Sequence, residues 1–216
     1  MNNIITPNEY NFLEFSRLTL IKELDEIIKK TGEKMEGNCL YQHHSNFEYH
    51  LNNKENLRYN IFALCKNRHS ILEVGFNGGH SVALYTYSNP NIKVKSFDIC
   101  HHNYSEKCAN YIKKYSNYNF ELIKGDSQKT LKTYKECIKF DIIHIDGGHG
   151  YNVAKSDLLN CKKFTHKNTI LIFDDAYTRD IKILLEDNIK NKFIEEVNYK
   201  ELNLKITKYH RIFYYK

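Results

Sequence analysis

The spacing of hydrophobic and polar residues changes at about residue 69 of the chain. Before that point the spacing predicts two helices, at residues 11–30 and 53–67, because apolar side chains recur every three or four positions. The segment between them is polar, and its residues 41–50 suit either a lid over a substrate or a plain polar loop. We therefore treat residues 1–68 as an N-terminal helical extension or lid.

Short apolar runs alternate with helical patterns in residues 69–216. The predicted strands cover residues 70–74, 92–99, 119–125, 140–145 and 168–175. The predicted helices cover residues 79–87, 104–115, 127–137, 151–163 and 178–190. This alternation is typical of an α/β fold with a Rossmann-like, mostly parallel sheet and helices on both faces. The tail adds two strand-like runs and no helix, so we expect seven strands with an antiparallel C-terminal edge.

Composition and charge exclude several classes of protein. With 41% hydrophobic and 27% charged residues, the 216-residue chain is globular. The net charge is +6, but the basic residues are scattered, so nucleic acid is not an expected partner. Apolar runs are too short for a membrane span, and the N-terminus does not resemble a signal peptide. Six separate cysteines without a C-x-x-C pair fit reduced thiols, so we expect a cytoplasmic, intracellular protein.

An acidic residue lies at the end of every predicted parallel strand. These residues are Glu73, Asp98, Asp126, Asp146, Asp174 and Asp175. In an open parallel sheet, ligands bind beyond the carboxyl ends of the strands. Clustered carboxylates repel one another, and a purely structural sheet does not need them. The sequence therefore predicts a binding or catalytic site at this edge.

The first strand leads into the turn "EVGFNGGHS", whose glycines allow a ligand to approach the backbone. The following helix offers free N–H groups to an anion. Asp98 is placed to accept hydrogen bonds from a ribose, and Asp126 with Ser127 could read an adenine amino group. Together they suit an adenosine with a short zwitterionic tail. The alternative is an ordinary strand-to-helix turn with helix caps at Asp98 and Asp126.

The fourth strand runs directly into Asp146, two glycines and His149. If the fourth and fifth strands are neighbours, Asp146, Asp174 and Asp175 lie side by side and favour a hard divalent cation. His149 is a candidate general base, because its ordinary pKa is near neutral. The alternatives are a helix cap at one of the last two aspartates and a surface or cap role for His149.

Residues 70–177 resemble the class I S-adenosylmethionine-dependent methyltransferases. Within them, "IDGGHGYNVAKSDL" followed by "ILIFDDAY" is similar to metal-dependent small-molecule O-methyltransferases, including the macrocin-type sugar O-methyltransferases. The family pattern joins an I-D-G-x-H-x-Y run, a D-L pair in the next helix and a D-D pair after the next strand. The matching positions are Ile145, Asp146, Gly147, His149, Tyr151, Asp157, Leu158, Asp174 and Asp175.

This resemblance implies a role for each matching residue. The residues implied to bind S-adenosylmethionine are Glu73, Gly75, Phe76, Asn77, Gly79, Ser81, Asp98, Asp126 and Ser127. Asp146, Asp174 and Asp175 would hold the divalent cation, Mg²⁺ before other metals, and His149 would act as the catalytic base with Asp146 beside it. By contrast, "CHHNYSEKC" at residues 100–108 fits no standard zinc module, and its place after the second strand favours a pocket wall.

The favoured function is methyl transfer to a hydroxyl of a small molecule. A sugar, glycan or nucleotide sugar ranks ahead of a catechol or phenol, and this preference rests on the resemblance alone. A nucleic-acid methyltransferase would usually carry an Asn/Asp-Pro-Pro-aromatic run where this chain has "DGGH". A non-catalytic binder is disfavoured by the complete set of acids with His149. A homo-oligomer stays open.

Overall fold

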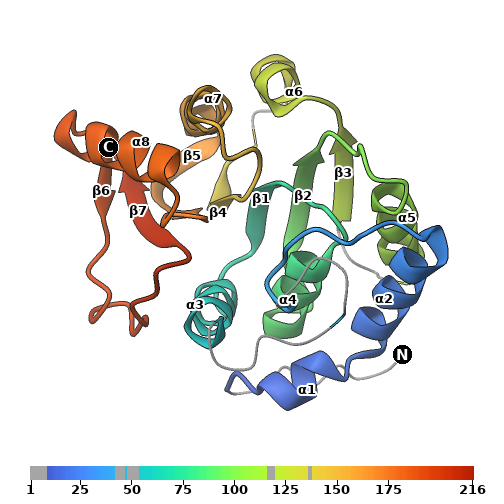
Figure 1. The fold of residues 1–216 in the computed structure, drawn as a ribbon. Helices are drawn as coiled ribbons and strands as arrows, with labels where there is room; N and C mark the ends of the chain where they lie inside the picture. The colour runs from blue at the N-terminus through green and yellow to red at the C-terminus, as the bar shows by residue number, and fades with distance from the viewer. Residues whose placement is uncertain (1–8, 42–46, 48–53, 116–119, 136–137) are drawn as a thin grey trace.

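The structure is a computed structural model that describes residues 9–41, 47, 54–115, 120–135 and 138–216. Its centre is a seven-stranded sheet with the order β3-β2-β1-β4-β5-β7-β6 (Figure 1). The strands are β1 (Ser70–Val74), β2 (Lys93–Asp98), β3 (Phe120–Lys124), β4 (Phe140–Ile145), β5 (Thr165–Phe173), β6 (Ile194–Glu196) and β7 (Arg211–Tyr215). Strands β1 to β5 are parallel, and β7 is antiparallel to β5 and β6. The predicted fold class is confirmed.

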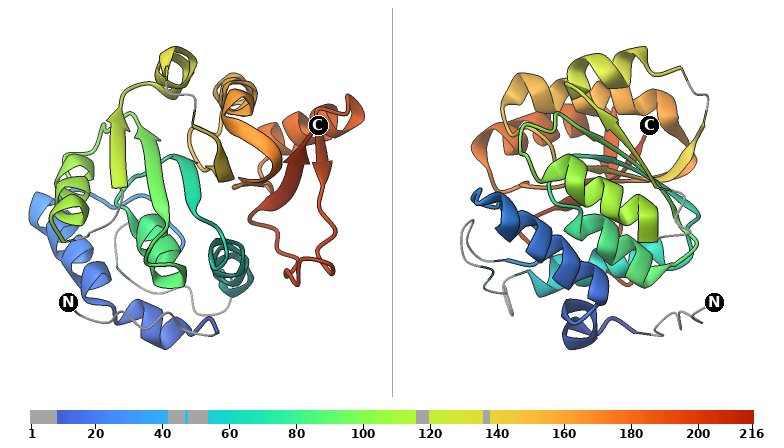
Figure 2. Two further views of the ribbon diagram at one scale, coloured as in Figure 1. Left: turned by 180° about the vertical axis from the view of Figure 1, so that it is seen from behind. Right: turned by 90° about the vertical axis from the view of Figure 1, so that its right-hand side faces the viewer.

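Helices cover both faces of this sheet (Figure 2). On one face lie α6, α7 and α8, with α2, α3, α4 and α5 on the other. The helices are α1 (Phe12–Ser16), α2 (Thr19–Thr31), α3 (Glu55–Cys65), α4 (His80–Ser88), α5 (Ser105–Tyr115), α6 (Ser127–Thr133), α7 (Tyr151–Cys161) and α8 (Arg179–Lys190). A short 3₁₀ helix, Lys162–Phe164, precedes β5.

Successive residues of the central strands enter two different hydrophobic cores. In β4, Ile142 packs in the core beside α3 and α4, whereas Ile143 and Ile145 pack in the core beside α7 and α8. This alternation follows from the two-residue period of a strand, because both faces are covered by helices. His144 therefore shares the face of Ile142 and points toward α4.

The predicted helix at residues 11–30 is interrupted in the structure, so its continuity was predicted wrongly. Leu18, between α1 and α2, has a non-helical conformation with ψ 137°. Phe15 and Leu24 are both fully buried in one core. Nine positions at about 100° each would put these two side chains on opposite sides of a continuous helix. The break allows both of them to face the same core.

The described part of the N-terminal segment packs against the rest of the molecule. Helix α2 contacts α4 and α5, and α3 contacts α4. The division of the chain at residue 69 and the role of a lid stay predictions. Most of the candidate lid at residues 41–50 lies outside the described residues, which include only Tyr41 and Phe47 of it. Among the described helices, none combines the length and the apolar character of a membrane span.

Candidate active site

The carboxyl ends of four neighbouring strands are level with one another. Val74 at the end of β1 pairs with Phe97 of β2 and with Ile145 of β4, and Ile145 pairs with Phe173 of β5. The residues that follow these positions form one row along the edge of the sheet: Gly75, Asp98, Asp146 and Asp174. The predicted convergence of strand-end acids is confirmed for these three aspartates.

The turn after β1 touches the loop after β4. Gly75 has φ 97°, and a Cβ atom there would lie 2.0 Å from the carbonyl oxygen of Asp146, so only glycine fits. The turn ends at Gly79, which has φ 82° and is the N-cap of α4. The first N–H groups of a helix have no partner within it, and they attract an anion. The end of the turn therefore offers N–H groups that can bind a carboxylate of a ligand beside Asp146.

Asp98 holds the backbone of this glycine turn. Its Oδ2 accepts hydrogen bonds from the N–H groups of Phe76 and Asn77 at 2.7 and 2.8 Å, and its Oδ1 accepts from Cys100 at 2.6 Å. The Asn77 side chain is also engaged, because its Oδ1 accepts from Tyr104 Oη at 2.5 Å. Asp98 thus shapes the turn, while its predicted contact with a ribose stays a prediction.

Glu73 and Ser81 bond to each other inside the core. The Glu73 carboxylate is fully buried and accepts from Ser81 Oγ at 2.5 Å, Tyr85 Oη at 2.8 Å and Ser96 Oγ at 2.5 Å. Burial raises the pKa of Glu73 above its ordinary value, despite these three donors. These hydrogen bonds connect α4 with β1 and β2. They thereby hold in place the two elements that flank the glycine turn, β1 and α4. The predicted contact of Glu73 and Ser81 with the methyl donor stays a prediction.

Asp126 and Ser127 begin α6 at the end of β3. Asp126 is the N-cap, and its Oδ1 accepts from the N–H of Gln128 at 3.0 Å, as the helix-cap alternative expected. Ser127 lies close to Asp157 of α7. Asp157 is fully buried, and neither of its oxygens has a hydrogen-bond partner among the described residues. Burial raises the pKa of Asp157 to about 6.

Asp146 belongs to two groups of side chains that could hold a metal ion. With the buried His144 and the partly buried Asp174 it forms one group, and with the exposed His149 and the partly buried Asp175 it forms the other. In each group the three ligand atoms lie within 4.8 Å of one another. His149 Nε2 is 2.6 Å from Asp175 Oδ2, and His144 Nε2 is 3.8 Å from Asp174 Oδ2. The structure therefore brings both predicted acids to Asp146, each accompanied by a histidine.

The pKa values of Asp146 and Asp174 are shifted in opposite directions. Burial and the neighbouring carboxylates of Asp174 and Asp175 raise the pKa of Asp146 well above its ordinary value. Burial also acts to raise the pKa of Asp174, but the adjacent His144 ring outweighs it, so that pKa is lowered. The hydrogen bond to Asp175 raises the pKa of His149. A shared proton or a bound cation would relieve the repulsion at Asp146.

Two residues near this cluster were missed by the sequence analysis. His144 is buried, and its Nδ1 is 2.5 Å from Tyr85 Oη, which also bonds to Glu73. The sequence did contain one indication of His144, because a histidine within the apolar run "FDIIHI" is unusual in a buried strand. Lys54, at the start of α3, lies near enough to lower the pKa of both Asp146 and Asp174. No sequence pattern connects Lys54 with those acids.

Comparison with known proteins shows similarity to methyltransferases. Residues 72–176 match the model of a family described as a methyltransferase domain. Among curated proteins, no match to the sequence is found. Structures of the same fold include an O-methyltransferase from Bacillus cereus in complex with SAH, with a TM-score of 0.62 and 15% identity over 93% of this chain and 92% of that one.

Two further structures share the fold. The O-methyltransferase TomG from Streptomyces achromogenes, in complex with SAM, has a TM-score of 0.62 and 12% identity over 94% of this chain and 95% of that one. CalS11, a TDP-rhamnose 3'-O-methyltransferase, has a TM-score of 0.52 and 13% identity over 70% of this chain and 74% of that one. The matched region contains the glycine turn and the acid cluster, and its similarity to a methyltransferase domain supports the predicted S-adenosylmethionine-dependent methyltransferase.

Proposed function

We propose that this enzyme transfers the methyl group of S-adenosylmethionine to a hydroxyl oxygen of a small molecule, with His149 as the base and a divalent cation in the acid cluster. The observation that carries this proposal is the close approach of Gly75 to the backbone of Asp146. Because of it, the turn that suits the methyl donor and the cluster that suits a hydroxylated acceptor share one wall.

The proposed reaction requires the acceptor oxygen to lie in line with the sulfonium methyl at about 3 Å. A carbon–oxygen bond forms as the carbon–sulfur bond breaks, and S-adenosylhomocysteine leaves as a neutral thioether. The hydroxyl proton passes to His149. Glycine at position 75 keeps side-chain atoms out of the space between donor and acceptor, and the α4 N-terminus would hold the donor's carboxylate.

The acid cluster fits a divalent cation on two grounds. Its three aspartates offer carboxylate oxygens, which suit magnesium or manganese. His144 Nε2 is buried without a hydrogen-bond partner among the described residues, so this nitrogen lacks a partner that a cation would supply. Asp146, Asp174 and Asp175 would hold the cation. When bound, it would chelate two adjacent acceptor oxygens and make a hydroxyl easier to ionise.

His149 is oriented for proton transfer by Asp175. With Nε2 directed at Asp175 Oδ2, Nδ1 is the ring nitrogen that would accept the proton. The His149 side chain is 57% exposed, so an acceptor can reach it. Asp175 has φ 52°, a backbone region that non-glycine residues rarely adopt and that is often found at functional sites.

We propose a sugar or a sugar-containing metabolite as the acceptor, with a catechol or phenol as the alternative. Tyr177 is 55% exposed two residues after Asp175, and its ring contacts Tyr209 edge-on. An exposed aromatic face suits either ring type. The sugar is favoured by the motif resemblance, and CalS11, which shares the fold, is named for a TDP-rhamnose acceptor.

This proposal is tested with methyl-labelled S-adenosylmethionine and two acceptor panels, nucleotide sugars with free sugars and catechols with phenols. Each reaction is run with magnesium and with EDTA, and the products are identified by mass spectrometry. We expect a labelled methyl ether on a sugar, formed with magnesium and lost in EDTA. A product only from the phenolic panel would replace the acceptor class. Labelled product on nitrogen or carbon alone would contradict O-methylation.

A further inference from the structure

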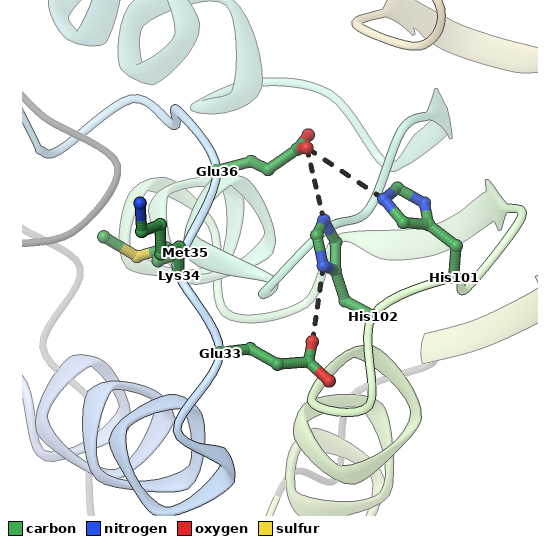
Figure 3. Close-up of a pocket in the computed structure, with 6 residues that line it drawn as sticks. All are labelled: Glu33, Lys34, Met35, Glu36, His101 and His102. Atoms are coloured by element: carbon green, nitrogen blue, oxygen red, sulfur yellow. Dashed lines mark ion pairs between the residues drawn. The ribbon is translucent and has the colours of Figure 1, made fainter.

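A second group of metal-ligating side chains lies outside the acid cluster. Glu33 and Glu36 come from the segment between α2 and α3, and His101 and His102 come from the loop between β2 and α5 (Figure 3). With Lys34 and Met35 they line a surface cleft of about 560 Å³. We call these four residues, Glu33, Glu36, His101 and His102, the His101 cluster. The proposed reaction uses none of them.

Three side chains of the cluster converge on one point. His102 Nε2 is 3.5 Å from Glu36 Oε1, and His101 Nε2 is 4.0 Å from the same oxygen. All three ligand atoms lie within 4.8 Å of one another. Ligands at about 2.0–2.1 Å from a tetrahedral zinc ion are about 3.3 Å apart. The first distance already matches, and the second needs a small movement of two exposed side chains.

The environment of His102 selects the nitrogen that would face a metal. Its Nδ1 is 3.4 Å from Glu33 Oε2, and Glu33 is itself held by the N–H of Asn103 at 3.1 Å. The ring stacks on Tyr104, with the planes 9° apart. Its Nε2 is buried and makes no hydrogen bond with a described residue. A carboxylate on one ring nitrogen of a histidine, with the other directed at a common point, is the usual arrangement behind a metal ligand.

The geometry points to a zinc-class transition-metal site formed by Glu36, His101 and His102, with Glu33 orienting His102. Two imidazole nitrogens and one carboxylate oxygen suit Zn²⁺ or Co²⁺ better than Mg²⁺, which prefers oxygen ligands. Three protein ligands leave one position for water. The competing explanation is that His102 contacts the two glutamates and no metal binds.

A metal here would fasten the segment of residues 33–37 onto the glycine turn. Glu36 N–H donates to Tyr104 Oη at 3.4 Å, and Tyr104 Oη donates to Asn77 Oδ1 at 2.5 Å. Asn77 Nδ2 donates to the Gly37 carbonyl at 3.3 Å. The segment therefore already rests on Asn77, and the metal would hold it in place. The metal site stands on its own residues, whereas an effect on the methyl donor rests on the proposed function.

The first test measures Zn²⁺ binding by competition with a chromogenic chelator, and Co²⁺ binding by its visible absorption, with excess Mg²⁺ to occupy the acid cluster. We expect one Zn²⁺ per chain and a Co²⁺ spectrum typical of nitrogen and oxygen ligands. His101→Gln should weaken binding by about tenfold or more, and Glu33→Gln by about tenfold through the orientation of His102. His101 is 59% exposed, so its replacement should leave the fold intact.

Two control variants make the result decisive. His166→Gln removes a histidine that pairs with Asp141 on another part of the surface, and Asp175→Asn alters the acid cluster. Neither should change Zn²⁺ affinity at the His101 cluster. Equal Zn²⁺ affinity in the parent and in His101→Gln would overturn the proposal and leave only the contacts of His102 with the two glutamates. Loss of binding in Asp175→Asn alone would assign the zinc to the acid cluster.

A second readout separates this inference from the proposed function. Zn²⁺ should raise the thermal unfolding temperature of the parent and not that of His101→Gln. If Zn²⁺ stabilises the parent but leaves SAH affinity unchanged, the metal site stands and its link to the donor fails. If neither protein responds to Zn²⁺ while SAH binds normally, the site is refuted and the methyltransferase assignment is untouched.

Discussion

The charged form of the buried Asp157 carboxyl group is expected to destabilise the folded protein. The substitution Asp157→Asn should therefore increase the free energy of unfolding. The carboxyl group of Asp157 is fully buried, and the nearby Ser127 side chain does not make up for the lost contact with water. Burial raises its pKa from the ordinary 3.8 to about 6. The folded protein therefore binds this proton more tightly than the unfolded chain does. Stability is lost as the pH rises from about 4 toward about 6, and the loss persists above that.

The size of the effect follows from the difference between the two pKa values. A difference of about 2 corresponds to about 3 kcal/mol of lost stability at pH 7.5, where the buried carboxylate is charged. At pH 5 most of the folded protein keeps this proton, whereas the unfolded chain has largely lost it. About half of the loss of stability therefore remains at pH 5. Asparagine has the same shape and no charge to bury. Its advantage over the parent should therefore be about 3 kcal/mol at pH 7.5 and about half of that at pH 5.

Urea unfolding followed by circular dichroism, at pH 5.0 and at pH 7.5, gives both free energies. Asp187→Asn is the matched control, because Asp187 is an exposed aspartate of α8 and its replacement should change stability little at either pH. An Asp157→Asn protein that is no more stable than the parent at pH 7.5 would refute the reasoning. So would an advantage of equal size at both pH values, since charge burial could not explain it.

Three further predictions concern the site. Gly75→Ala should weaken SAH binding by more than tenfold in calorimetry, because the alanine Cβ would lie 2.0 Å from the carbonyl oxygen of Asp146. The control Gly150→Ala, whose Cβ would enter open space, should bind SAH normally. Equal SAH affinities of the two variants would contradict binding of SAH at the glycine turn. Asp174→Asn should lose magnesium-stimulated turnover while SAH affinity is kept, and turnover unchanged by the mutation or by EDTA would argue against the cation. His149→Ala should lower kcat by about 10²-fold or more, and a rate within threefold of the parent would exclude it as the base.

The fold could be predicted from the sequence because burial on both faces leaves a strong pattern. "ILIF" at the end of "THKNTILIF" is a continuous apolar run, and "SILEV" is apolar at three of its five positions, as is typical of strands covered on both sides. The row of acids followed from the same reasoning, since parallel strands end at one edge. The break at Leu18 was not visible, because it depends on which core receives Phe15 and Leu24.

Contacts between distant segments were out of reach of the sequence. The ribose contact predicted for Asp98 stays a prediction, and the sequence did not show that its carboxylate accepts hydrogen bonds from the turn of Phe76 and Asn77. His101 and His102 lack the spacing of a zinc module, and Glu36 joins them only through the packing of the segment after α2. Periodicity reports the local environment of a residue, whereas such contacts depend on tertiary structure.

The central claim is that the methyl donor and the cation meet along one row of strand ends. A crystal structure with SAH and Mn²⁺, located by its anomalous scattering, tests it directly. We expect SAH against the turn of Gly75 and Mn²⁺ ligated by Asp146 with Asp174 or Asp175. Mn²⁺ bound away from Asp146, or SAH bound away from this turn, would contradict the account.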